Sequence, residues 1–465
     1  MEVIRAESRP YLQHAAFGFI MDFVRDFAKL NVDDSSEVTL RDFSRALAQR
    51  VQKSENREKI FNAFKSILES QPEKENALQN LGAQITQALK LLLSEIASMR
   101  PLVAVFEDMQ WADEQSKRTL QEILEDTQLR GAILFLFTGR ERSDFPSFFI
   151  HTEMIHLQPF DAEKARRFVM SRFASPEHAQ PVVNAIIANG EGNPFYLNEM
   201  LASLVDTGVC RTEGPERKLV PVRQISTAFD VKAFPTLEGI LSARVDALEP
   251  ELRRILRIAA VLGRKFNKAA LDKACGVDTG PALEIFIRKQ LIRPLENEGR
   301  YSFTQSIMRD YCYATLPEEE RVEAHRIQAE TILASPGYKP AIDDVIVARH
   351  LELSGQKQRA AQYYLQSAHH ARRFGKNANQ EALSHYQKVL ELMPNEWELV
   401  FHARRDREWI WRNMGMREEQ FEEIQAMRQL AETTNNLRWR AEVLCRELAY
   451  YQESGETKKT DQLAE

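Results

Sequence analysis

The sequence predicts a mixed α/β core followed by all-helical domains, and three patterns lead to this prediction. Two short hydrophobic runs, 102–106 and 132–137, flank a helix expected from Glu114 to about Glu125. A strand, a helix and a second strand in this order form a right-handed βαβ unit with parallel strands. Further along, several short helices precede two strand candidates, and only helical patterns occur beyond about residue 341.

The composition is that of a folded protein. With 465 residues, of which 43% are hydrophobic, the chain is long enough for about three domains. Its formal net charge of -6 does not favour nucleic acid or an anionic membrane as a partner. The first residues lack the apolar core of a signal peptide, and no hydrophobic run is long enough to span a membrane. We therefore expect a soluble, cytoplasmic protein.

The pattern of the four cysteines is also typical of a cytoplasmic protein. Cys210, Cys275, Cys312 and Cys445 lie far apart, and no two of them form a CxxC pair. Each stands among apolar or helical residues, so we expect buried, reduced thiols and no zinc site.

Helices are also expected before the first hydrophobic run. Apolar residues recur at three- and four-residue steps from Tyr11 to Leu30, and a strongly apolar helix runs from Leu81 to Met99 until Pro101 terminates it. Asp113 and Asp161 are expected to cap the helices that follow them.

The second half of the chain changes character after a polar stretch, Gly208 to Pro235, that is typical of a linker. Helices closed by a β-hairpin then indicate a winged helix. The expected helices are Leu237–Leu248, Glu251–Leu262, Lys268–Cys275 and Pro281–Gln290, and the expected strands are Leu291–Leu295 and Arg300–Phe303. Beyond them, stacked helical hairpins are expected, with Gly375, Gly415 and Gly455 recurring every 40 residues as turn glycines.

The acidic pair Glu107 and Asp108 ends the first hydrophobic run. Open parallel sheets bind ligands outside the carboxyl ends of their strands. P-loop NTPases use such acids to hold Mg²⁺ and to position the attacking water. An isolated acidic pair can also do no more than cap the next turn.

The whole segment from Val103 to Asp113 resembles the Walker B segment of STAND-type ATPases, the signal-transduction ATPases with numerous domains. Further stretches match that family in order, and the resemblance covers roughly residues 80 to 335. These stretches are the sensor segment Phe137–Arg140, the Gly-Asn-Pro-Phe segment Gly192–Glu199, and the winged-helix segments Ser242–Leu248, Ala259–Gly263 and Tyr301–Tyr313. The chain is similar to the ATPase modules of bacterial class III adenylate/guanylate cyclases and of helical-repeat transcription activators.

The resemblance implies an α/β P-loop NTPase-like core, incomplete here, followed by an all-α winged helix and TPR-like helical repeats. The implied boundaries are 1–160 for the core, 161–235 for a helical lid and linker, 236–335 for the winged helix and 336–465 for the repeats.

It also implies a site for ATP or ADP with Mg²⁺. In that site Glu107 would hold the metal, Asp108 would polarise the attacking water, Arg140 would lie near the γ-phosphate, and Pro194 would pack on the nucleotide. Two of these residues have simpler interpretations, since Arg140 can be an exposed arginine at a strand end and Pro194 can simply begin a helix.

The sequence departs from the family pattern at three points. Gln110 and Gln305 each stand where the family usually has His. More seriously, the sequence Gly-x-x-x-x-Gly-Lys-Ser/Thr occurs nowhere, so no backbone nest or lysine is present to cradle the phosphates. In the family that loop precedes the region that resembles these first helices. At the other end, residues Lys458 to Glu465 stop inside a helical pattern without the polar cap that a repeat array needs. We therefore expect both ends of the chain to be cut.

We therefore expect part of a nucleotide-switched signalling ATPase that does not hydrolyse ATP alone. The alternative is a non-catalytic scaffold whose repeats bind a protein partner. Self-assembly fits the first interpretation. DNA is not expected as a partner, because the helix that would read it, Pro281–Gln290, offers only Arg288 and Lys289.

Overall fold

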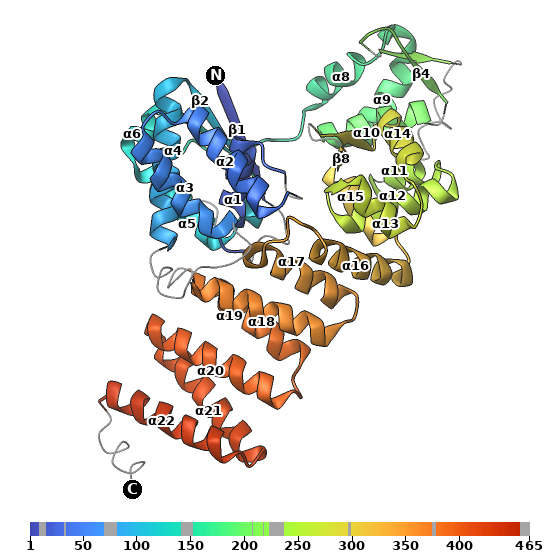
Figure 1. Ribbon diagram of the computed structural model, residues 1–465. Coiled ribbons are helices and arrows are strands. Elements are labelled where there is room, and N and C mark those ends of the chain that lie inside the picture. The colour runs from blue at the N-terminus through green and yellow to red at the C-terminus, as the bar shows by residue number, and fades with distance from the viewer. Residues whose placement is uncertain are drawn as a thin grey trace. The chain divides into compact units, whose positions relative to one another are not determined.

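The computed structural model describes residues 1–8, 15–31, 34–68, 81–140, 152–206, 208–216, 218–222, 237–295, 299–373 and 378–455. These residues are mostly helical and include three small β-sheets. They divide into two compact units (Figure 1). The first unit comprises Met1–Thr152 and Ala329–Glu465, and the second comprises Glu153–Gln328.

The first unit contains a parallel sheet of β1 (Glu2–Glu7), β2 (Leu102–Glu107) and β3 (Ile133–Phe137), with β2 in the middle. Leu102 lies opposite Glu2 on one side and opposite Ile133 on the other. The two strands expected from the hydrophobic runs are therefore confirmed. β1 was not predicted, because its sequence mixes charged and apolar residues, as an edge strand can.

The helices of this part of the first unit agree closely with the predictions for α4 and α5. The described elements are α1 (Gly18–Ala28), α2 (Ser36–Arg50), α3 (Ser54–Leu68), α4 (Leu81–Met99), the 3₁₀ turn η2 (Met109–Trp111), α5 (Glu114–Glu125) and α6 (Thr127–Ala132). α1 begins at Gly18, later than the predicted Tyr11, and Phe17 before it has a left-handed backbone with φ of 59°. Residues 11–14 of the predicted helix lie outside the described residues.

Aromatic side chains join α1 to the sheet. The ring of Phe106 on β2 stacks on that of Phe23 at 5.3 Å and meets that of Phe19 edge-on at 5.6 Å. It also stacks on Phe137 of β3 at 5.4 Å. Such ring pairs contribute about 0.5–1.5 kcal/mol beyond the area they bury. Burial of this cluster therefore fixes α1 over the middle of the sheet.

The two predicted strands are not equally buried. Alternate residues of β2 are buried and half-buried. On β3, however, Leu134 is 56% exposed and Leu136 is 45% exposed. A continuous hydrophobic run is typical of a parallel strand that is buried on both faces, but β3 is an edge strand of the described sheet and one of its faces is exposed.

The predicted helical array is confirmed in the second part of this unit, where each helix packs on the next in sequence. Its helices are α17 (Pro340–Leu353), α18 (Lys357–Arg373), α19 (Asn379–Leu392), α20 (Trp397–Met414), α21 (Arg417–Thr433) and α22 (Leu437–Glu453). Gly415 ends α20 with φ of 74°, a conformation that glycine adopts without strain. Gly455 has the same φ after α22, whereas Gly375 lies outside the described residues.

The second unit begins with a small helical group. It contains α8 (Ala162–Met170), the 3₁₀ turn η3 (Pro176–Ala179), α9 (Gln180–Asn189), α10 (Pro194–Asp206) and the antiparallel strands β4 (Cys210–Glu213) and β5 (Lys218–Pro221). The linker prediction is therefore wrong for the part of Gly208–Pro235 that is described, since it forms a hairpin. Leu219 of β5 is buried among the helices, and this burial holds the hairpin in place.

The remaining elements of the second unit include every predicted helix and strand, each within a few residues of its predicted bounds. They are α11 (Leu237–Asp246), α12 (Pro250–Leu262), β6 (Lys265–Asn267), α13 (Lys268–Cys275), α14 (Gly280–Arg288), β7 (Ile292–Pro294), β8 (Arg300–Phe303) and α15 (Ser306–Ala314). α16 (Glu318–Leu333) follows and continues into the first unit. The third strand, β6, pairs with β8 and was not predicted, because three residues are too few to show a pattern.

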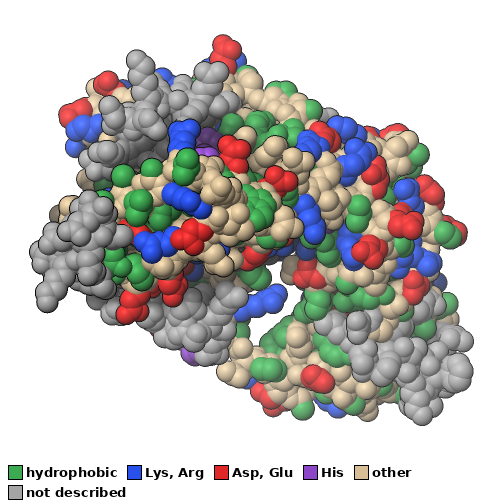
Figure 2. Space-filling model, turned by 90° about the horizontal axis from the view of Figure 1, so that it is seen from below, with side chains coloured by type: hydrophobic (Ala, Val, Ile, Leu, Met, Phe, Trp, Pro, Cys, Tyr) green, Lys and Arg blue, Asp and Glu red, His purple; other side chains and the backbone are tan. Residues whose placement is uncertain are grey.

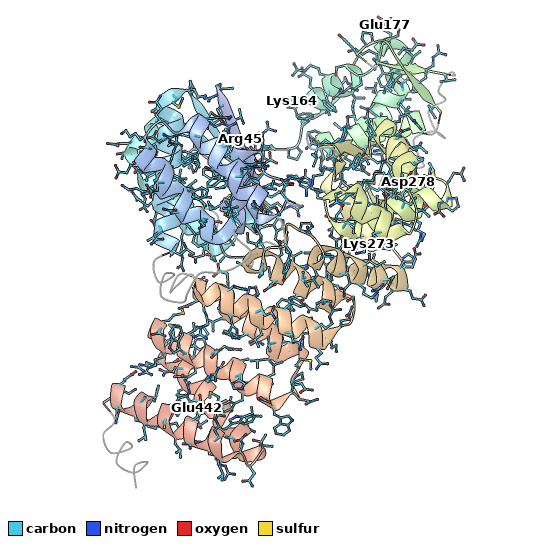
Figure 3. All side chains as sticks on the ribbon, viewed as in Figure 1. Arg45, Lys164, Glu177, Lys273, Asp278 and Glu442 are labelled. Carbon is cyan, nitrogen blue, oxygen red and sulfur yellow. The ribbon has the colours of Figure 1, made fainter. Side chains whose placement is uncertain are left out.

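Exposure corrects one prediction about the cysteines. Cys210, Cys275 and Cys312 are buried free thiols, and burial raises the pKa of each. Cys445 is a free thiol too, but it is exposed. Charged residues such as Arg45, Lys164 and Lys273 extend outward from their helices (Figure 3). No described helix is both long and apolar enough to cross a bilayer.

A buried ion pair joins α10 to α11 in the second unit. Nη1 of Arg244 lies 2.5 Å from Oε2 of Glu199, and both side chains are 4% exposed. Nη2 of Arg244 also donates to the carbonyl oxygen of Lys289, just beyond α14, at 2.7 Å. One guanidinium therefore ties together three helices.

Removing one partner of this pair should destabilise the second unit. In a buried pair, loss of one partner costs about 3–5 kcal/mol, because the other charge is left uncompensated. We expect Glu199→Ala to lower the free energy of unfolding by this amount in urea titrations of the full chain. The double variant Glu199→Ala with Arg244→Met should lose less than the sum of the two single variants. Strictly additive losses would show that the pair is not coupled.

Candidate functional site

The carboxyl ends of β2 and β3 are joined by a short hydrogen-bond ladder. The backbone N–H of Thr138 donates to the carbonyl oxygen of Phe106 at 2.9 Å, and the N–H of Met109 donates to that of Thr138 at 2.9 Å. The N–H of Asp108 donates to Oγ1 of Thr138 at 3.3 Å. The acidic end of β2 and the carboxyl end of β3 therefore lie directly beside each other.

Asp108 occupies an uncommon backbone conformation at this edge. Its φ of 59° and ψ of 43° lie in the left-handed region, and the 3₁₀ turn η2 follows immediately. Residues other than glycine adopt this region rarely, although aspartate does so more often than most, and they cluster at functional sites. The left-handed residue bends the chain sharply where β2 ends, so that Asp108 lies at the rim of the sheet.

A further carboxylate comes from the strand that the sequence did not predict. In the register of β1 with β2, Glu7 lies opposite Glu107, and the N–H of Ser8 donates to the carbonyl oxygen of Glu107 at 3.0 Å. The N–H of Glu7 itself donates to the carboxylate of Asp22 on α1. Glu7 could have been found only if the first residues had been recognised as a parallel strand.

The side chain of Gln110 connects Asp108, which follows β2, with Arg140, which follows β3. Its Nε2 donates to Oδ1 of Asp108 at 3.1 Å, and its Oε1 accepts from the backbone N–H of Arg140 at 3.0 Å. The side chain is only 4% exposed, so loss of either hydrogen bond would leave a buried polar group without a partner, which costs free energy. A neutral histidine also has one donor and one acceptor nitrogen, so a histidine at this position could make the same two hydrogen bonds.

Asp113, the last residue of the Walker B-like segment, has a structural role. Its Oδ1 accepts from the N–H groups of Phe17 and Ser116, each at 2.9 Å. Its Oδ2 accepts from the N–H of Phe19 at 3.1 Å and from Oγ of Ser116 at 2.7 Å. Burial raises the pKa of Asp113 to about 6, against the effect of these hydrogen bonds. The predicted cap of α5 is confirmed, and the same carboxylate also holds the start of α1.

The structure therefore brings Glu107, Asp108 and Arg140 to one edge of the sheet. Glu107 and Asp108 are half-buried, and Arg140 is exposed. No group of three His, Cys, Asp or Glu residues in the described ranges is arranged to hold a metal ion by itself. Mg²⁺ does not need such a cage, because it commonly takes one or two carboxylates and completes its shell with water and phosphate oxygens.

Pro194 lies in the second unit, where it is the first residue of α10. Asn193 before it accepts from the N–H of Phe195 at 3.0 Å through its side chain, which starts the helix. Gly192 has φ of 69°, and a Cβ there would come within 2.1 Å of the carbonyl oxygen of Phe160. The local backbone therefore requires a glycine at position 192. Contact of Pro194 with a nucleotide stays a prediction.

Comparisons with known proteins give distant similarities. No family model matches the chain. It is 23% identical over 335 residues to the peroxide stress-activated histidine kinase mak3 of Schizosaccharomyces pombe, covering 68% of this chain and 14% of that protein. It is 21% identical over 295 residues to an uncharacterized protein of Rhizobium meliloti, covering 60% of this chain and 27% of that protein. The chain therefore spans only a minor part of both relatives.

One solved structure is also similar in outline. It is the crystal structure of a Signal Transduction ATPase with Numerous Domains (STAND) protein with a tetratricopeptide repeat sensor from Pyrococcus horikoshii. The match covers 99% of this chain and 79% of that chain, with 11% sequence identity and a TM-score of 0.41.

The bridging role of Gln110 can be tested by hydrogen exchange. In Gln110→Ala the N–H of Arg140 loses its acceptor, and loss of about 1 kcal/mol should raise its exchange rate roughly fivefold to tenfold. Gln110→His should keep the slow exchange, and Gln128→Ala on the exposed face of α6 is the control. The measurement is deuterium uptake in a peptide that includes residues 138–140. Unchanged uptake in Gln110→Ala would contradict the bridge.

Proposed function

We propose that the chain is part of a nucleotide-switched signal-transduction ATPase of the STAND type. The observation that carries the proposal is the hydrogen-bonded connection of Asp108 and Arg140 through Thr138 and Gln110 at the carboxyl ends of β2 and β3. Ligand sites of open parallel sheets lie at this edge. The motifs that resemble the family, and the distant relative named as a stress-activated histidine kinase, support a role in signalling.

The residues at this edge fit part of a site for ATP or ADP with Mg²⁺. Glu107 would hold the hydration shell of the metal, which would neutralise phosphate charge when bound. Asp108 would accept a hydrogen bond from the attacking water, and Arg140 would lie near the γ-phosphate. What the sequence lacks is the glycine-rich loop with its lysine, which makes most of the contacts to the β- and γ-phosphates.

The exposed strand β3 suggests how such a loop would reach the site. A hydrophobic parallel strand is usually buried on both faces and paired on both sides. Leu134 and Leu136 are instead 56% and 45% exposed. We infer that a further strand and helix pack beside β3, and that this strand carries the phosphate-binding loop to the edge where Asp108 lies.

The other parts of the chain would transmit the state of the site. We assign the winged-helix-like region 236–335 to an internal lever that does not read DNA. Figure 2 shows lysine and arginine side chains interspersed with aspartate and glutamate on one face of the molecule. Within region 236–335, the helix that would read DNA offers only Arg288 and Lys289. The TPR-like helical repeats, 336–465, would bind a protein partner, and switching would favour self-assembly or control of an attached effector. The scaffold alternative keeps only the partner-binding role.

The assigned roles predict that Asp108 becomes catalytic when the loop is supplied. The test is to fuse a phosphate-binding segment from a STAND relative to the N-terminus and to measure ATP turnover. Loss of a group that positions water typically removes a factor of about 10² to 10⁴ in rate, so Asp108→Asn should lower turnover by that factor. Asp126→Asn, which alters the cap of α6, is the matched control and should retain full turnover.

Two outcomes would count against the proposal in different ways. Equal turnover in the fused protein with Asn at position 108 would show that Asp108 does not position the water. A correctly folded fusion without any ATP turnover would favour the non-catalytic scaffold.

A further inference from the structure

A buried carboxylate without a hydrogen-bond partner lies inside the first unit, where the repeat array (α17–α22) meets the core (the parallel sheet with α1–α6). Glu381 is the third residue of α19 and is 3% exposed. Both of its carboxylate oxygens are buried and accept no hydrogen bond from the described residues. Burial of an unpaired ionised carboxylate is costly, so buried carboxyl groups are normally paired or protonated.

The first turn of α19 packs in the same apolar cluster as the helices that cover the sheet. Ala378 and Ala382, which flank Glu381, are completely buried. They belong to one hydrophobic cluster with Ala112, just before α5, and Leu120 within α5. The carboxyl group of Glu381 therefore lies in an apolar interior rather than at the surface.

The charged groups that face Glu381 from α5 and its cap do not neutralise it. Asp113 and Glu114 repel its negative charge, whereas Arg118 attracts it. Arg118 is exposed, so solvent and salt screen its effect. Glu114 is paired with Lys117 at 2.8 Å, but Asp113 is buried close to Glu381 without a basic partner of this kind. The ionised form of Glu381 is therefore disfavoured.

The described basic side chains on the other neighbouring helices interact with other groups. Near the end of α18, which packs along α19, three pairs have distances of 3.2–3.4 Å: Arg372 with Asp406, His369 with Asp406, and His370 with Asp344. On α1, Arg25 acts on the charge of Asp343 in α17. On α19 itself, the ring of His385 stacks on that of Tyr364. Among the groups that the structure describes, a proton is therefore what can neutralise Glu381.

We propose that the packing of the repeat array on the core is a pH-sensitive contact, in which Glu381 holds a proton while α19 lies against α5. Loss of the proton would leave a buried negative charge beside Asp113. Separation of the two helices would return the carboxylate to water, where its charge is stabilised. The proposal concerns control of the array and does not rest on nucleotide binding.

The direction of the pH dependence follows from the surroundings of the carboxyl group. Burial and the nearby charge of Asp113 raise the pKa of Glu381 from its ordinary 4.5 to about 8. Below about pH 4.5 the group is protonated whether or not α19 is packed. Between that pH and about 8, the packed state keeps a proton that the separated state releases, so packing weakens by up to about tenfold per pH unit. Above about pH 8 the group is ionised in both states and the dependence ends.

Hydrogen exchange of the full chain, followed by mass spectrometry, tests this contact. Peptides from α5 and α19 are compared at equal pH in the native chain and in Glu381→Gln, which keeps the side-chain size but cannot ionise. Asp113, with a pKa of about 6, changes little above pH 6.5. From pH 6.5 to 8.5, exchange in the native chain should rise roughly 10- to 30-fold relative to the variant. A peptide from α21 should show no such rise.

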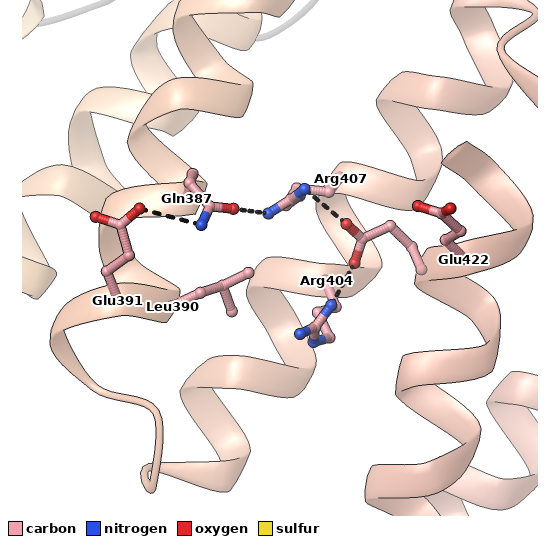
Figure 4. Close-up of a pocket in the computed structure, with 7 residues that line it drawn as sticks. Gln387, Leu390, Glu391, Arg404, Arg407 and Glu422 are labelled. Atoms are coloured by element: carbon pink, nitrogen blue, oxygen red, sulfur yellow. Dashed lines mark hydrogen bonds and ion pairs between the residues drawn. The ribbon is translucent and has the colours of Figure 1, made fainter. Parts of the chain in front are cut away.

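Two further variants sharpen the comparison. Glu391→Gln is the matched control on the same helix, because Glu391 is exposed and accepts a hydrogen bond from Gln387 beside a polar pocket between α19, α20 and α21 (Figure 4). This variant should follow the native chain at every pH. Glu381→Met, which places no polar group in the interior, should lack the pH dependence as Glu381→Gln does. Circular dichroism shows whether each variant is folded.

A ratio of exchange rates that stays constant from pH 6.5 to 8.5 in folded variants would overturn the proposal. If neither variant at position 381 folds, the rates of the native chain divided by the intrinsic exchange rates give the same test, and a corrected rate that does not rise would also overturn it. A rise that α21 shares equally would show global unfolding and would overturn the assignment to this contact. ATP turnover tests the nucleotide role separately.

Discussion

The parallel register of the three strands is the constraint on which the candidate site depends. Because β2 pairs with β1 and with β3 in the same direction, the residues that end these strands lie along a single edge. Thr138 then fixes the two later strand ends to each other, and Gln110 joins Asp108 to Arg140. An antiparallel third strand would have put Arg140 at the opposite end of the sheet. The proposed chemistry therefore follows from strand direction as much as from the identity of the acids.

The residues of the motifs that resemble the STAND family fall into two groups in this structure, according to whether they lie at the sheet edge or are buried between helices. Glu107, Asp108 and Arg140 lie at the sheet edge, where a ligand would meet them. Asp113 and the pair of Glu199 with Arg244 are instead buried ties between helices. Residues of the second kind can be retained because the fold needs them, even where no nucleotide binds. Resemblance at the buried positions therefore indicates a shared architecture, and only the residues at the sheet edge bear on catalysis.

The sequence predicted the elements with strong periodicity and missed those whose stability comes from partners elsewhere. α4 and α13 begin and end as predicted, because long apolar stripes and clear stop signals define them. β1 was missed because its edge position allows charged residues, and the β4–β5 hairpin was missed because burial against distant helices stabilises its polar sequence. At the site, the adjacency of Glu107, Asp108 and Arg140 was predictable from parallel strands. The bridge through Gln110 was not, because it depends on a left-handed turn at Asp108.

The central claim is that this chain carries the acidic and sensor side of a nucleotide site but lacks the phosphate cradle. Calorimetric titration of the isolated chain with ATP and Mg²⁺ tests it most directly. Without the loop, few donors face the β- and γ-phosphates, so we predict a dissociation constant weaker than about 1 mM, which corresponds to roughly -4 kcal/mol. Micromolar binding, of about -8 kcal/mol, would contradict the account, because it would require a phosphate-binding element that the sequence does not contain.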